Sequence, residues 1–316
     1  MSTEDLPRCA MQWKRRHADD PDIHIKKIHN MKLRDDDIFL CSFPKSGTHW
    51  VWRILDMVVN KSSEYSHRVV DAGFLDQQHV DSMENMASPR VMSTHLPLTA
   101  LPKQVKARRT KLVHVYRDPK AVTVSLYFQW KTSGKVNDIT MEKVVDAFNT
   151  EKALLLQRLR RHVVTWYIIR VISMTSSIPR PNVKMGANKN WFHWMDQVAE
   201  FERNHPEVPI FHVSYEELKL MADFLEVPLT RRLCQEISEA VSFSRQRQEE
   251  NKRAGGPATF EKIFYRKGEI SDWKNHLTVA QRERLDKAVR DRAHKCPFSA
   301  KYVPTSDNDA DALNEC

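Results

Sequence analysis

The chain turns from a short apolar run into an amphipathic stretch at Phe43-Pro44-Lys45-Ser46-Gly47-Thr48-His49-Trp50. The run before it, residues 38–43, is short and almost wholly apolar, as in a buried parallel strand. After it, apolar residues recur at helical spacing over residues 50–59. The sequence therefore predicts a strand, a loop and a helix. In this arrangement the N–H groups at the start of the helix bind a phosphate or sulfate.

Two residues of the loop favour an anion as its ligand. Gly47 permits a tight backbone, and Lys45 adds a full positive charge. The loop is not the usual nucleotide-triphosphate loop, in which Gly comes first and a Lys-Ser/Thr pair closes the motif. Taken by itself, it could also be an ordinary turn with a solvated lysine.

A second segment, residues 111–128, reads as a β-rich strand over residues 112–116, a turn and a helix. Arg117 ends the strand and Ser125 lies about two turns into the helix, so both could converge on one anion at the rim of the sheet. A third segment, residues 266–268, joins two cations to a glycine that lets the backbone approach a ligand. Such a tripeptide is also common on solvated loops.

Taken together and in this order, the three segments resemble the cytosolic sulfotransferase family. Members of that family transfer a sulfuryl group from 3′-phosphoadenosine 5′-phosphosulfate (PAPS) to a hydroxyl or an amine. The resemblance implies that residues 45–49 hold the 5′-phosphosulfate, and that Trp50, Tyr215 and Phe243 lie at the adenine. It assigns to the 3′-phosphate Arg117, Ser125, Arg266, Lys267 and Gly268. The full implied cofactor set is Lys45, Ser46, Gly47, Thr48, His49, Trp50, Arg117, Ser125, Tyr215, Phe243, Arg266, Lys267 and Gly268.

The catalytic candidate is His95, in a Thr-His-Leu-Pro segment that resembles the corresponding segment of the family. Neutral histidine titrates near neutral pH and suits the removal of the acceptor's proton. The other interpretation is a histidine at a strand end that is satisfied by backbone. Lys45 would have a second, catalytic role, stabilising charge on the bridging oxygen. We expect no metal, because the sequence holds no Cys/His cluster with metal spacing.

Strands that alternate with helices predict a single α/β domain with a central parallel sheet flanked by helices and a P-loop-like phosphate-binding strand-loop-helix. We expect an irregular lead-in over residues 1–34, the sulfotransferase domain over 35–298 and a loose polar tail over 299–316. Relative to the family, residues 151–185 look like an insert. That insert could be a substrate-gating excursion, a partner-binding helix or a poorly ordered segment.

The composition agrees with one large folded domain. The chain has 316 residues, and its 41% hydrophobic content suffices for a sizeable core. The formal charge of +9 suits an anionic cofactor, but also nucleic acid or an anionic membrane surface. We expect no nucleic-acid partner, because no such module is visible and the cations are dispersed.

The five cysteines are odd in number and form no CxxC pair, which favours reduced thiols. The N-terminus has no apolar core, and the longest apolar stretch, residues 163–172, is too short to span a bilayer. These features predict a cytoplasmic enzyme with no membrane segment. We expect a small-molecule acceptor as partner and a possible homodimer. The family's dimer-forming pattern is matched by Lys274, Thr278, Val279 and Glu283. The other interpretation of that pattern is a plain helix start capped by threonine.

The chain departs from the family pattern at several positions. His49 replaces a small hydroxylic residue, Ser93 stands where many members carry lysine, and Val241 lacks a hydroxyl that commonly faces the cofactor. After Glu217 the chain is also shorter than the family by about a dozen residues. These differences keep open a catalytically weakened cofactor-binding or interaction protein. A competing kinase interpretation requires a Gly-first loop for ATP and magnesium, which the sequence lacks. The acceptor, whether phenol, alcohol, steroid or amine, is not defined by the sequence.

Overall fold

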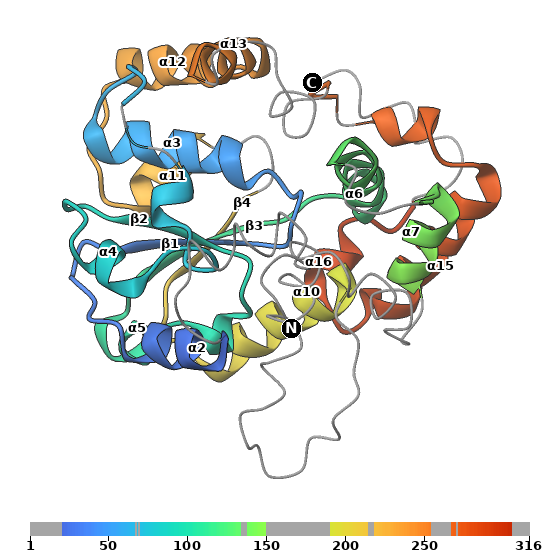
Figure 1. The fold of residues 1–316 in the computed structure, drawn as a ribbon, viewed down its shortest axis with the longest axis horizontal. Coiled ribbons are helices and arrows are strands. Elements are labelled where there is room, and N and C mark those ends of the chain that lie inside the picture. Colours follow the sequence, from blue (N-terminus) through green and yellow to red (C-terminus); the bar gives the residue numbers. More distant parts are fainter. Residues whose placement is uncertain are drawn as a thin grey trace, which may run out of the picture.

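A computed structural model of the chain describes residues 21–66, 68, 70–133, 138–149, 190–213, 218–253, 267–269 and 271–304. In this part of the chain, a four-stranded sheet has the order β2-β1-β3-β4 (Figure 1). All three strand pairs are parallel. The strands are β1 (Ile38–Ser42), β2 (Val91–Thr94), β3 (Lys111–Val115) and β4 (Ile210–Val213). The predicted α/β architecture with a central parallel sheet is confirmed.

Helices cover both faces of this sheet (Figure 1). In β1, Leu40 packs into an apolar cluster with α3, α11 and α12, whereas Phe39 and Cys41 pack into a second cluster with α2, α10 and α15. Because successive strand residues point to opposite faces and helices cover both faces, β1 is buried along its whole length. The helices are α2 (Pro21–Asn30), α3 (Thr48–Asn60), α4 (Val80–Glu84), α5 (Gln104–Arg108), α6 (Pro119–Ser133), α7 (Met141–Asn149), α10 (Trp191–Asn204), α11 (Leu218–Phe224), α12 (Arg231–Ala240), α13 (Phe243–Arg253), α15 (Val279–Ala293) and α16 (Pro297–Ala300).

Both ends of the described chain are more regular than the sequence analysis expected. Within the predicted irregular lead-in, α2 is helical and buries Ile28 completely. His24 of the same helix donates from Nε2 to the Leu75 carbonyl at 2.8 Å. At the other end, Phe298 and Ser299 are buried, so packed chain continues past the start of the predicted tail. The predicted insert at residues 151–185 lies outside the described residues, and the domain boundaries stay a prediction.

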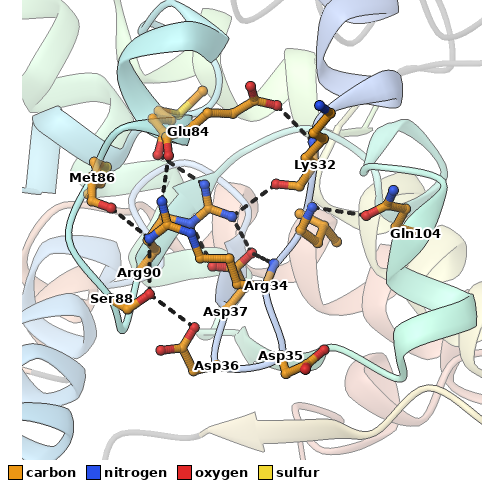
Figure 2. A network of polar contacts seen from close by, with 12 residues as sticks. Lys32, Arg34, Asp35, Asp36, Asp37, Glu84, Met86, Ser88, Arg90 and Gln104 are labelled. Carbon is orange, nitrogen blue, oxygen red and sulfur yellow. Dashed lines mark hydrogen bonds and ion pairs between the residues drawn. The ribbon is translucent and has the colours of Figure 1, made fainter.

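A buried ion pair holds the amino ends of β1 and β2 together (Figure 2). Arg90 donates to both carboxylate oxygens of Asp37, from Nε at 2.6 Å and from Nη2 at 2.5 Å. Its remaining N–H groups reach the carbonyls of Met83 and Lys32. The neighbouring Arg34 binds the chain just before β2 through the Glu84 and Met86 carbonyls. This network fixes the amino-terminal ends of β1 and β2, which lie at the end of the sheet opposite to the phosphate loop.

Replacing Asp37 by Ala should lower the free energy of unfolding by about 3–5 kcal/mol, because it leaves the buried Arg90 charge unpaired. Denaturant unfolding measures the change. Asp35→Ala is the control: its side chain is 93% exposed and pairs with Arg108 at the surface. That variant should cost less than about 1 kcal/mol. Equal losses in the two variants would contradict a specific role for the buried pair.

Candidate active site

The carboxyl ends of β1 and β2 bring the phosphate loop and the catalytic candidate together. The two strands are neighbours, with Cys41 opposite Thr94, so Ser42, the last residue of β1, and His95, the first residue after β2, lie side by side. The loop after β1 leads directly into α3. Parallel strands end at one edge of a sheet, and that edge is where ligands bind in open α/β folds.

The loop has the backbone of an anion-binding turn. Lys45 has a φ of 68° and Gly47 a φ of 111°, both in the left-handed region that favours glycine. Gly47 is the N-cap of α3 and contributes no side-chain cap, so the helix start lacks a capping acceptor from that residue. Ser46 is 4% exposed, and its hydroxyl has no hydrogen-bond partner in the described part of the chain. Thr48 shares a 2.7 Å hydroxyl contact with Ser42.

The imidazole of His95 is held in one tautomer. Its Nδ1 lies 2.7 Å from the carbonyl oxygen of Ser42, which only accepts, so Nδ1 carries the proton. In the neutral ring Nε2 is then unprotonated and can take a proton. Burial lowers the pKa of His95 to about 4, and the Lys45 charge acts in the same direction, while the bond to Ser42 opposes them. The ring is therefore a neutral base at physiological pH.

Two aromatic side chains complete the setting of His95. Its ring packs edge to face against Phe74, with 5.0 Å between centroids. The indole of Trp194, on α10, donates to the His95 carbonyl at 3.3 Å. Both aromatic residues are buried. Phe74 comes before His95 in the sequence and Trp194 comes after it, so two distant segments of the chain hold the histidine.

His49 adds a second neutral imidazole to the same region. Burial lowers its pKa to about 3, with further contributions from the charges of Lys45, His95 and Arg53. At neutral pH the ring therefore carries no charge beside the phosphate loop. The surroundings of His49 thus suppress the charge that a histidine could carry at this departure from the family.

The sequence analysis missed one carboxylate in the site. Asp76 is 3% exposed and accepts from the Thr94 hydroxyl at 2.6 Å and from the backbone N–H of His95 at 2.9 Å. Burial raises its pKa to about 7, against the hydrogen bonds that it accepts. An aspartate after two apolar residues is no signal in a sequence, because the contact depends on sheet geometry.

The second predicted segment meets the first. Arg117 follows β3, and its Nη1 donates to the Lys45 carbonyl at 3.4 Å. Ser125 lies in the second turn of α6, as expected from the spacing. The structure thus brings Arg117 to the phosphate loop.

The segments predicted to bind adenine and the 3′-phosphate also approach one another. Trp50 donates from its indole to the Val241 carbonyl at 2.8 Å. Gly268 has a φ of 79°, and a Cβ at this position would lie 2.4 Å from the ring of Phe243. The ammonium of Lys267 lies 2.8 Å from Asp272. Trp50, residues 241–243 and Gly268 are therefore one neighbourhood, in which only a glycine fits against the Phe243 ring.

The remaining predicted positions fall into two groups. Tyr215 and Arg266 lie outside the described residues. Ser93 and Val241, two departures from the family, have buried side chains: Ser93 pairs with Leu40 of β1, and Val241 packs in the cluster around α3. The Ser93 hydroxyl has no partner among the described residues. Its small side chain leaves this position without a cation.

Among the described residues, no group of three or more His, Cys, Asp or Glu side chains could hold a metal ion. None of the helices in the described ranges is long and apolar enough to cross a membrane.

The family model of the sulfotransferase domain matches residues 35–297. The chain therefore belongs to the sulfotransferase family, as its three motifs predicted. Among curated relatives, it is 26% identical to sulfotransferase 6B1 of Danio rerio, over 88% of this chain and 85% of the relative. It is 27% identical to amine sulfotransferase of Oryctolagus cuniculus, over 87% of this chain and 86% of the relative.

Solved structures share the fold. A mouse sulfotransferase, SULT7A1, complexed with adenosine 3′,5′-bisphosphate (PAP), aligns with a TM-score of 0.62 at 20% identity. The alignment covers 89% of this chain and 93% of that one. Retinol dehydratase in complex with androsterone and the inactive cofactor PAP aligns with a TM-score of 0.59 at 18% identity, over 90% of this chain and 88% of that one. These likenesses support the α/β fold described above.

The suppressed charge of His49 makes stability depend on pH. Its pKa is about 3 in the folded chain against an ordinary value of 6.5, so between these values the unfolded chain binds more protons and stability falls as pH drops. His49→Gln should reduce the slope of unfolding free energy against pH by at most about 1.4 kcal/mol per unit. Denaturant unfolding at several pH values measures both slopes. Parallel curves for the two proteins would contradict a His49 that is neutral in the folded chain.

Proposed function

We propose that this chain transfers a sulfuryl group from PAPS to a hydroxyl or an amine of a small molecule. The observation that carries the proposal is the bond from His95 Nδ1 to the Ser42 carbonyl, which leaves Nε2 as proton acceptor beside the phosphate loop. A base and an anion site at the same edge of the sheet are what sulfuryl transfer requires.

The residues of the loop fit a phosphosulfate. The buried Ser46 hydroxyl lacks a partner in the described part of the chain, and the start of α3 lacks a side-chain cap. An anion would satisfy both, and the charges of Lys45 and Arg117 favour it electrostatically. Two similar structures are complexes with PAP, the product that PAPS leaves after transfer. Both points support PAPS as donor.

In the proposed reaction, His95 Nε2 takes the proton of the acceptor as the acceptor's oxygen or nitrogen forms a bond to sulfur. The bond between sulfur and the bridging oxygen breaks, and its electron pair stays with adenosine 3′,5′-bisphosphate (PAP). Lys45 stabilises the negative charge that develops on this oxygen. Positioning and electrostatics supply most of the rate, as in phosphoryl transfer. No step requires a metal.

We propose that the rest of the predicted set binds the donor. Trp50 and Phe243 would lie at the adenine, which their shared neighbourhood with Val241 and Gly268 supports. Arg117, Ser125, Arg266, Lys267 and Gly268 would bind the 3′-phosphate, with Tyr215 at the adenine. Lys267 would then share its ammonium between the phosphate and Asp272.

The acceptor is proposed only as a class. One curated relative is an amine sulfotransferase, and two similar structures, both of retinol dehydratase, hold androsterone and retinol. These names support small molecules that carry a hydroxyl or an amine. The alternative, a catalytically weakened binder, is favoured by Ser93, which offers no cation at a position where many members carry lysine.

Replacing His95 by Ala should reduce kcat for transfer from labelled PAPS about 100- to 10,000-fold, the usual contribution of a general base. Binding of PAP should stay near the wild-type value, since the bond to Ser42 is not part of the phosphate loop's own cradle. The control is His205→Ala, because His205 lies just after the far end of α10 and outside the proposed site. That variant should keep the wild-type rate.

Two outcomes would contradict the proposal. If wild-type protein binds PAP yet transfers sulfuryl to no phenol, alcohol, steroid or amine in a broad panel, the chain is the weakened binder. If transfer occurs and His95→Ala leaves its rate nearly intact, another group is the base.

We also propose a homodimer through Lys274, Thr278, Val279 and Glu283. All four are exposed, Val279 at 63%, and Thr278 caps α15 in a capping box with Gln281. Sedimentation velocity that gives the mass of one chain at high concentration would refute this interface.

A further inference from the structure

We infer that Asp76 is a positioning residue for sulfuryl transfer, which acts by holding the backbone of His95 so that the imidazole stays in its reactive setting. The inference rests on the proposed function. Asp76 accepts hydrogen bonds from Thr94 and from the backbone of His95, so its effect passes through His95. Three features of the structure support this role.

The first feature is the path of the chain around Asp76. Residues 74–76 run beside β2 and extend the sheet by a short parallel pairing: Phe74 bridges to Ser93, and the Leu75 N–H donates to the Ser93 carbonyl at 2.9 Å. On its other side, the Leu75 carbonyl accepts from the buried His24 of α2. This segment is therefore fixed from two directions, and Asp76 at its end has a defined place next to the end of β2.

The second feature is the set of donors that Asp76 binds. His95 is the first residue after β2, where the sheet no longer supplies an acceptor for its N–H group. Asp76 Oδ2 supplies it at 2.9 Å, while Oδ1 accepts from the Thr94 hydroxyl at 2.6 Å. The Thr94 oxygen in turn accepts from the Leu96 N–H at 2.9 Å. One carboxylate and one hydroxyl thus fix three consecutive residues at the turn that carries the base.

The third feature is that the carboxylate is kept although its burial is unfavourable. Asp76 is 3% exposed, and burial raises its pKa to about 7. A buried carboxylate is destabilising unless its oxygens are hydrogen-bonded. Here the carboxylate accepts from the Thr94 hydroxyl and from the His95 N–H, both at the end of β2. Phe74, two residues earlier, packs on the imidazole itself, so one short segment sets both the backbone and the ring of His95.

Removal of this support should misplace the imidazole without disturbing the phosphate loop. Asp76→Ala leaves the His95 N–H and the Thr94 hydroxyl without their acceptor. A shift of about 1 Å at a catalytic group costs about 100-fold in rate, so kcat should fall by about that factor. Asp76→Asn keeps an oxygen that can face the His95 N–H, with its amide NH₂ toward the Thr94 oxygen. This conservative variant should stay within about tenfold of wild type.

The experiment measures kcat for sulfuryl transfer, the dissociation constant of PAP and the ¹⁵N signals of the His95 ring in each variant. The expected result is a loss of kcat in Asp76→Ala, an unchanged dissociation constant and partial rescue in Asp76→Asn. In wild type the ring signals should report a protonated Nδ1 and an unprotonated Nε2. In Asp76→Ala they should report a mixture of tautomers, because the bond to the Ser42 carbonyl is less populated.

The matched control is Asp56→Ala. Asp56, on α3, is 1% exposed and likewise accepts from a hydroxyl, that of Ser66, at 2.6 Å. It lies outside the proposed site. It should lose stability as Asp76→Ala does, yet keep the wild-type kcat and ring signals in the folded fraction.

Four results would overturn the role of Asp76, and the first three concern kcat alone. Those three are a wild-type kcat in Asp76→Ala, an equal loss of kcat in Asp56→Ala, or an Asn variant as slow as the Ala variant, which would indicate charge instead of positioning. A loss of PAP binding together with kcat would likewise mark a general structural role. His95→Ala separates the two hypotheses. If this variant does not slow sulfuryl transfer, the proposed base is wrong. If His95→Ala slows transfer while Asp76→Ala keeps the wild-type rate, only the inference about Asp76 is lost.

Discussion

The hydrogen bond from His95 Nδ1 to the Ser42 carbonyl is the interaction on which the candidate site depends. It exists because β1 and β2 are parallel neighbours whose carboxyl ends meet, with Cys41 opposite Thr94. The same strand end begins the phosphate loop. A single backbone carbonyl therefore selects the tautomer of the base and fixes its distance from the anion site. The wider fold supports this site by burying both faces of the sheet. The pair of Asp37 and Arg90 holds the strands together at the opposite, amino-terminal end.

Burial sets the charges of the site. Lys45 and Arg117 supply positive charge at the loop, whereas desolvation lowers the pKa of His95 and of His49 far enough to keep both rings neutral. Because both imidazoles are neutral, neither competes with Lys45 and Arg117 for the anion. Each ring retains its capacity to exchange a proton. The positive charge of the site then resides on Lys45 and Arg117.

Local sequence patterns predicted the parts of the site that local chemistry determines. The apolar run before Phe43, the glycine at 47 and the spacing after Trp50 indicated a strand, a loop and a helix, and β1 and α3 occupy these positions. The order of three motifs identified the family. The helix α2 was missed because it is short and polar and its stability comes from packing of Ile28 and His24 on the sheet.

Contacts between distant segments were beyond the sequence. The bond from Trp50 to the Val241 carbonyl joins residues 191 apart, and Asp76 meets His95 only through the extra pairing beside β2. Neither leaves a periodic signal, because sheet order and loop paths decide them. The neutral state of His49 was missed for the same reason: a pKa depends on burial and neighbouring charges, which a list of residues does not contain.

Thermal stabilisation by adenosine 3′,5′-bisphosphate, compared with ADP and AMP, tests the central claim most directly, since it requires no knowledge of the acceptor. At about 100 times its dissociation constant, a ligand of the native state contributes about 2.7 kcal/mol, a shift of several degrees. The account predicts selective stabilisation by the 3′,5′-bisphosphate without magnesium. No shift, or a preference for ADP with magnesium, would contradict a PAPS site in this fold.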